Sequence, residues 1–76
     1  MRITLRSFGP LREARGGRSD EELDVPAGAS VGEVVGGLAL PVGLPVTCAV
    51  NESVVSRDTV LQEGDELALL PPVGGG

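Results

Sequence analysis

The last six residues of the chain could do chemistry through the main chain instead of through a side chain. They are two prolines, a valine and three glycines, at Pro71, Pro72, Val73, Gly74, Gly75 and Gly76. Prolines favour an extended chain and glycines carry no side chain, so this thin strip reaches roughly 20 Å. At its tip, the α-carboxylate of Gly76 becomes an acyl donor once another protein activates it with ATP. A sulfur donor could then convert the acyl adenylate to a thiocarboxylate.

Composition excludes most chemistry that relies on side chains. The 76 residues include no His, no Lys and one Cys, so we expect no nucleophile–histidine pair, no metal site and no internal disulfide. A net charge of -5 and a single aromatic residue, Phe8, argue against binding to nucleic acid. No apolar run approaches the ~20 residues of a membrane span, and no signal peptide is evident. We expect a cytoplasmic protein that binds no cofactor of its own and no membrane.

The apolar pattern predicts one small α+β domain over residues 1–70, followed by a flexible Gly-Gly tail over residues 71–76. Alternating or β-branched apolar residues are typical of strands. Strands are expected at 2–8, 21–25, 46–50, 54–55 and 66–70. With the first and last strands adjacent, the chain would leave from the end of a central strand. This order predicts a mixed sheet of about four or five strands, crossed by one short helix, of the ubiquitin kind.

The crossing helix is expected to begin after Ser30. Ser30 and Glu33 have the spacing of a capping box. Apolar residues follow at helical spacing, at Val31, Val34, Val35 and Leu38. Three glycines weaken this helix by about 1 kcal/mol each, and the sequence offers no reason for them. They are Gly32, Gly36 and Gly37.

Short motifs near both ends of the chain resemble those of a known family. They are Phe8-Gly9-Pro10-Leu11-Arg12-Glu13, Ala49-Val50-Asn51, Val55-Ser56, Asp58, Leu61, Gly64-Asp65-Glu66-Leu67-Ala68 and the tail from Pro71 to Gly76. Together they resemble the MoaD/ThiS family of sulfur carrier proteins, which has a β-grasp fold. The ending Pro-Pro-Val-x-Gly-Gly is more similar to MoaD, the small subunit of molybdopterin synthase, than to ThiS.

The resemblance implies a cycle with three partners. A MoeB-like enzyme would use ATP to adenylate the carboxylate of Gly76, and a sulfurtransferase would convert it to the thiocarboxylate. The tail, with Gly74 and Gly75, would then enter a MoaE-like large subunit and supply sulfur for molybdopterin. The chain would be a protein co-substrate and not an enzyme.

Apolar residues beside the tail are candidates for partner docking. They are Leu69, Pro71, Pro72 and Val73. The other interpretation of Leu69 is a core residue. Phe8 is expected to pack in the core or at its edge and not to contact a partner. Cys48 is expected to be a small buried apolar residue. The basic cluster of Arg12, Arg15 and Arg18 fits either a solvated face or a contact with an acidic partner.

Three other interpretations remain open from the sequence. Sulfur could go to another acceptor, such as the thiazole of thiamine, cysteine or a specialised thio-metabolite. The same adenylate could instead be passed to a lysine of a target protein, as in a ubiquitin-like modifier. A simple interaction module, with a frayed glycine end, is the third.

Overall fold

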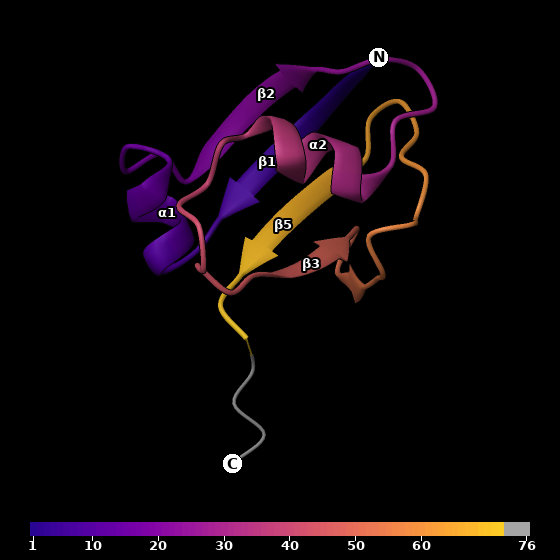
Figure 1. Cartoon of the computed structure of the whole chain (residues 1–76). Coiled ribbons are helices and arrows are strands. Elements are labelled where there is room, and N and C mark those ends of the chain that lie inside the picture. The colour runs from indigo at the N-terminus through magenta and orange to yellow at the C-terminus, as the bar shows by residue number, and fades with distance from the viewer. Residues whose placement is uncertain (73–76) are drawn as a thin grey trace.

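The computed structural model describes residues 1–72, and the predicted order of elements is confirmed (Figure 1). The elements are β1 (Arg2–Ser7), α1 (Pro10–Ala14), β2 (Asp20–Asp24), α2 (Val31–Gly37), β3 (Thr47–Val50), β4 (Ser53–Val54) and β5 (Glu66–Leu70). The bounds of β5 are as predicted, and those of the other strands differ by one residue at one or both ends. From Val73 onward, the predicted flexible tail lies outside the described residues.

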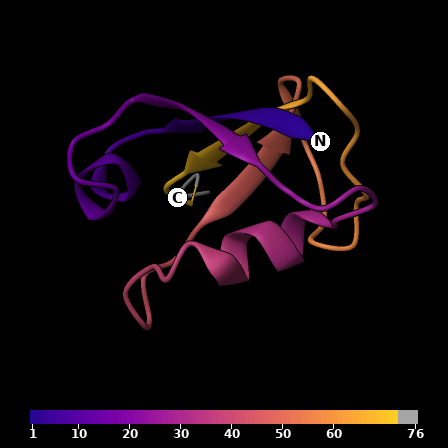
Figure 2. The same ribbon diagram turned by 90° about the horizontal axis from the view of Figure 1, so that it is seen from above.

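The strands form one mixed sheet in the order β2-β1-β5-β3-β4. β1 pairs antiparallel with β2 and parallel with β5, and β5 pairs antiparallel with β3. α2 covers one face of this sheet (Figure 2). The predicted mixed sheet crossed by a short helix is therefore confirmed. No helix within residues 1–72 has the length and apolar character needed to cross a membrane.

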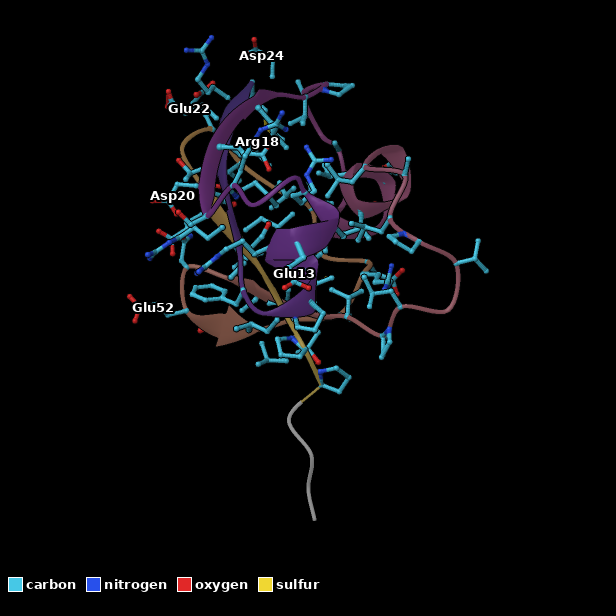
Figure 3. All side chains as sticks on the ribbon, turned by 90° about the vertical axis from the view of Figure 1, so that its left-hand side faces the viewer. Glu13, Arg18, Asp20, Glu22, Asp24 and Glu52 are labelled. Carbon is cyan, nitrogen blue, oxygen red and sulfur yellow. The ribbon has the colours of Figure 1, made fainter. Side chains whose placement is uncertain are left out.

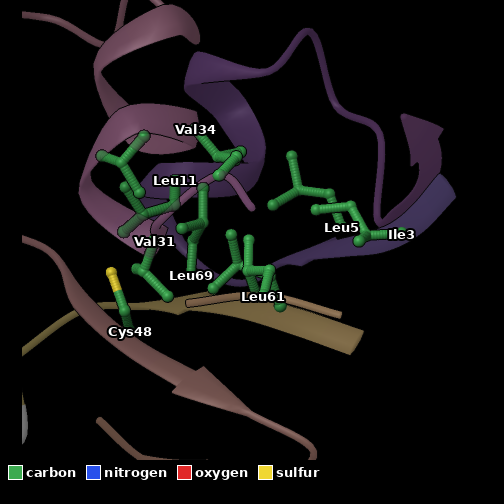
Figure 4. Packing of buried hydrophobic residues seen from close by; sticks show 11 residues of the cluster. Ile3, Leu5, Leu11, Val31, Val34, Cys48, Leu61 and Leu69 are labelled. Carbon is green, nitrogen blue, oxygen red and sulfur yellow. The ribbon is translucent and has the colours of Figure 1, made fainter. Parts of the chain in front are cut away.

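An aliphatic core fills the space between the sheet and α2 (Figure 4). Alternate residues of β1 and β5 face this core, so both strands are half-buried, as their sequence patterns predict. The buried members of this core cluster are Ile3, Leu5, Leu11, Ala29, Val31, Val34, Val35, Cys48, Leu61, Leu67 and Leu69. Phe8 does not belong to this cluster, because its position alternates onto the opposite face of the sheet.

The start of α2 has the predicted capping box. The hydroxyl of Ser30 accepts a hydrogen bond from the Glu33 N–H, and the Glu33 carboxylate accepts one from the Ser30 N–H, both at 3.1 Å. Close packing accounts for one of the helix glycines. The Gly32 N–H donates to the Arg57 carbonyl at 2.9 Å, and a Cβ on Gly32 would lie 3.2 Å from both Cβ and O of Arg57.

Candidate functional site

The predicted reactive end of the chain leaves the fold from β5, in the interior of the sheet. β5 lies between β1 and β3, so two neighbouring strands hold it on either side (Figure 1). Pro71 and Pro72 follow immediately and are exposed. Because proline has no N–H to donate, the sheet ladder cannot continue through these two residues. The predicted exit from the end of a central strand is confirmed.

The start of α1 borders this exit. The Phe8 N–H donates to the Leu69 carbonyl at 3.1 Å, which extends the parallel pairing of β1 and β5 by one bond. The next residue, Gly9, has φ 56° and ψ -132°, a conformation that favours glycine. This turn brings the main chain alongside Pro71, where a Cβ on Gly9 would lie 3.7 Å from Pro71 Cγ. The exit of the tail is thus formed by residues that follow β1 and by residues at the end of β5.

An apolar surface lies on the sheet face opposite α2. Register places Arg6, Ala68, Ala49 and Val54 side by side across four strands on that face. Leu70 is half-buried on the same face, and Val54 is 70% exposed. We call Phe8, Ala68, Leu70 and Val54 the open-face patch. It is continuous with the exposed prolines at the exit, so a partner that receives the tail can also contact this surface.

Charged residues border the open-face patch on the β2 side. Arg6 contacts Asp20 at 3.1 Å and Glu66 at 3.6 Å, and its guanidinium carbon lies 5.7 Å from the centre of the Phe8 ring. The hydrogen bond to Asp20 is the main reason why the pKa of Arg6 is raised further above its usual value. Arg6 is therefore charged, and it lies between the acidic residues Asp20 and Glu66 and the apolar ring of Phe8.

The structure separates the predicted docking residues. Pro71 and Pro72 are exposed at the exit, as a docking role requires. Leu69 is fully buried against Cys48 and Ser7 in the sheet register, so the interpretation as a core residue holds for its side chain. Outside the described residues lie Val73, Gly74, Gly75 and Gly76.

Sequence reasoning missed two members of this site. Phe8 was expected to pack in the core or at its edge and not to contact a partner; it lies half-buried on the open face beside the exit, where a partner can reach it. The pairing of Ser7 with Leu69 sets Leu70, and not Leu69, on the same face as Phe8. The signal was available in principle, because the parallel pairing of the first and last strands brings their ends together. A shift of one residue in a strand changes the face on which a side chain lies.

The basic cluster is largely exposed, as a solvated face would be, because Arg12 and Arg18 are exposed and Arg15 is half-buried. Arg15 donates two hydrogen bonds to Glu21, the shorter at 2.9 Å, and one to the Leu38 carbonyl at 3.3 Å. Arg12 donates to the Ser7 carbonyl at 3.2 Å, and Arg18 lies 3.6 Å from Glu21. Arg15 and Arg12 therefore join elements of the domain, which neither of the two sequence interpretations anticipated.

Cys48 is buried, as predicted, and burial raises the pKa of its thiol. A raised pKa leaves the thiol protonated and poorly nucleophilic. Within residues 1–72, no group of three or more Cys, Asp or Glu side chains is arranged to hold a metal ion.

A helix-crossed mixed sheet whose central strand runs out into an exposed extension defines a small protein of the β-grasp class. The chain belongs to the ThiS family, whose family model matches residues 5–76. It is 34% identical over 82 residues to the molybdopterin synthase sulfur carrier subunit of Mycobacterium tuberculosis, with 100% of this chain and 99% of that protein covered.

Two solved structures extend this comparison. The crystal structure of small archaeal modifier protein 1 from Haloferax volcanii is 25% identical, with a TM-score of 0.77 and both chains fully covered. A chain of the complex of subunits 1 and 2 of molybdopterin-converting factor from Helicobacter pylori is 27% identical, with a TM-score of 0.67 and both chains fully covered. The predicted β-grasp fold is thereby confirmed.

Proposed function

We propose that this chain is a sulfur carrier that serves as the small subunit of a molybdopterin synthase. The observation that carries the proposal is the exit of a glycine-ended chain from the central strand, beside an apolar open-face patch. Membership of the ThiS family and the likeness to the mycobacterial carrier subunit support it. In this role the chain is a protein co-substrate, and partner proteins supply the catalytic side chains.

The proposed cycle begins at the α-carboxylate of Gly76. A carboxylate oxygen attacks the α-phosphorus of ATP on a MoeB-like enzyme, which forms the acyl adenylate and releases pyrophosphate. The terminal sulfur of a persulfide on a sulfurtransferase then displaces AMP and forms an acyl disulfide. A second thiol attacks the sulfur of the sulfurtransferase in this bond, which leaves the thiocarboxylate and a new disulfide. The absence of side chains at Gly74, Gly75 and Gly76 allows close approach to this carbonyl in a narrow channel.

The final step requires a large subunit that resembles MoaE. The Helicobacter complex pairs a structurally similar chain with a second subunit, which supports a partner of this kind. The open-face patch and the exposed Pro71 and Pro72 form the surface that such a subunit would contact. There the thiocarboxylate supplies sulfur to a cyclic pterin precursor, for the dithiolene of molybdopterin.

Intact-mass measurement tests the proposal directly. The protein is incubated with ATP, a MoeB-like enzyme and a sulfurtransferase, and we expect the mass gain of one oxygen replaced by sulfur. A variant that lacks Gly75 and Gly76 should show no gain. Its unfolding temperature should be unchanged, because the core residues lie between Ile3 and Leu69. The proposal is wrong if the shortened chain gains sulfur as efficiently as the full chain.

The likeness to an archaeal modifier favours a second candidate, a ubiquitin-like modifier. Isopeptide conjugates between Gly76 and lysines of other proteins would support it, and a pure carrier should form none. The identity of the protein that co-purifies with this chain tests which molecule accepts the sulfur. A MoaE-like subunit supports molybdopterin synthesis, whereas a thiazole synthase would assign the sulfur to thiamine.

A further inference from the structure

A groove separates β2 from α2 on the covered face of the sheet, away from the exit of the tail. Its volume is about 420 Å³, which lies within the range of ligand pockets. Most of its lining is apolar and is contributed by Leu23, Val25, Ala29, Val34 and Leu38. Asp24 and Glu33, which are both acidic residues, also line it. The groove is thus suited to an aliphatic side chain with positive charge nearby.

The strand that forms one wall of the groove is an edge strand, with unpaired main-chain groups. β2 lies at the end of the sheet order, and among the strands of residues 1–72 it pairs with β1 alone. Met1 and Val25 exchange two main-chain hydrogen bonds, of 2.8 Å and 2.6 Å, so the register makes Leu23 and Glu21 the next residues bonded to β1. In an antiparallel ladder the alternate residues turn their N–H and C=O groups outward. Glu22 and Asp24 therefore offer donors and acceptors at the free edge.

The two features belong to one site because of the alternation within β2. Leu23 and Val25 face the groove, while their neighbours Glu22 and Asp24 hold the unpaired main-chain groups. A strand that pairs with this edge would place every second side chain over the groove. Its remaining side chains would lie beside the outer row of β2, formed by Asp20, Glu22 and Asp24, which point away from α2 (Figure 3).

Charge selects the kind of strand that can pair here. Asp24 is bonded to Arg2 and Asp20 to Arg6, but Glu22 takes part in no ion pair within residues 1–72. The whole chain carries a net charge of -5. A second copy that paired through β2 would set acidic residues against acidic residues, which is destabilising. A partner strand with basic residues on its outer face would instead complement this row.

We propose that the groove between β2 and α2 binds an extended segment of a partner protein, in which branched aliphatic and basic residues alternate. The segment adds to the sheet as a strand beside β2. Its aliphatic side chains enter the groove, and its basic side chains lie beside Glu22. This second contact surface leaves the exit of the tail free, so a partner can hold the domain while the chain end is in use.

One helix glycine gains a role from this proposal. Gly37 lines the groove, and a Cβ built on it would have no heavy atom within 4 Å. A larger side chain there would occupy space that the partner needs. Gly36 also has no heavy atom within 4 Å of such a Cβ, but it does not line the groove. Gly36 and Gly37 therefore provide a matched test, because a Cβ at either position meets no steric obstacle within residues 1–72.

The experiment titrates isotopically labelled protein with a heptapeptide in which valine and lysine alternate, and follows the amide NMR signals. We expect the largest shifts at the outward-facing amides of Glu22 and Asp24. Gly37→Leu should weaken binding about tenfold or more, and Gly36→Leu by less than about twofold. A peptide of alternating valine and glutamate should bind at least about tenfold more weakly. Circular dichroism of both variants verifies that they are folded.

Each of the following results would overturn the proposal. One is equal affinity of the two leucine variants for the valine–lysine peptide. Another is a shift map centred on the open-face patch, or no binding by the unmodified protein at about 1 mM peptide. The last is shifts at Glu22 that depend on protein concentration without peptide, which would assign the groove to a second copy of the chain.

Discussion

At the scale of single residues, the pair of Arg15 and Glu21 joins three parts of the domain. Their side chains are only 18% and 11% exposed, and the shortest distance between their charged atoms is 2.9 Å. Arg15 follows α1, Glu21 belongs to β2, and the Leu38 carbonyl that Arg15 also contacts ends α2. Removing one member would leave the other charge half-buried without its partner, which is costly.

Glu21→Gln tests this pair through the pH dependence of stability. The hydrogen bond from Arg15 lowers the pKa of Glu21 in the folded protein. A lowered pKa contributes stability above the unfolded value, about 4.3, which is lost as pH falls through the folded value. The free energy of unfolding of the variant should be lower by about 1–3 kcal/mol at neutral pH, and it should decrease less steeply as the pH falls. Urea unfolding at a series of pH values measures both effects.

Asp24→Asn is the matched control for that experiment. Arg2 lowers the pKa of Asp24 through a hydrogen bond in the same way. That pair is exposed, however, with side chains 58% and 77% accessible, so solvent screens it. Its loss should change stability less than the loss of Glu21. Parallel acid profiles for Glu21→Gln and the unmodified protein would contradict the role given to Arg15.

At the scale of elements, α2 shows what local sequence can and cannot predict. Ser30 and Glu33 located its start correctly, because a capping box depends only on residues within one turn. Its glycines could not be explained, because their reasons lie elsewhere in the fold. Gly32 contacts Arg57, far along the chain, and Gly37 lines a groove that exists only when β2 lies beside the helix.

Alanine substitutions within α2 should separate these glycines by their effect on stability. Gly36→Ala should stabilise the protein by about 0.5–1 kcal/mol, because alanine has the higher helix propensity. At Gly32 the same change should destabilise it, since the new Cβ would lie 3.2 Å from Arg57 atoms, including a carbonyl oxygen. Chemical denaturation measures both. An equal gain in stability at Gly32 and Gly36 would show that Arg57 shifts away from the new Cβ at no cost.

The strands could be predicted because apolar alternation is a property of short stretches of sequence. The site depends on residues that are far apart in the sequence and was harder to predict. Alternation in β1 and β5 identified their buried faces, and the central exit followed once those strands were paired. Assigning Leu69 or Leu70 to the docking surface required the register of β5 against β1, which places Leu69 opposite the buried Ser7. Long-range register of this kind depends on the assembled sheet and not on any short stretch of sequence.

At the scale of the whole molecule, net charge should govern how fast partners find the domain. The chain carries a charge of -5 and has a pI near 4.4. Long-range attraction to a basic partner surface raises the association rate, and salt screens it. We expect the association rate with a basic large subunit to fall about tenfold or more between 20 mM and 500 mM salt. Stopped-flow fluorescence measures this rate.

The dissociation rate provides the control for the salt experiment. Screening of long-range attraction acts mainly on encounter, so dissociation should change much less than association. An association rate that is the same at both salt concentrations would show that charge has no part in the encounter.

The position of β5 also has a mechanical consequence. A partner that draws the chain end into a channel pulls on Pro72 along the axis of β5. The strand is bonded on both sides, to β1 and to β3, and those bonds run across the direction of the pull. The pull therefore loads these hydrogen bonds in shear, so that they resist it together and do not break one after another. The sheet is thus an anchor from which the tail can be held taut without unravelling the domain.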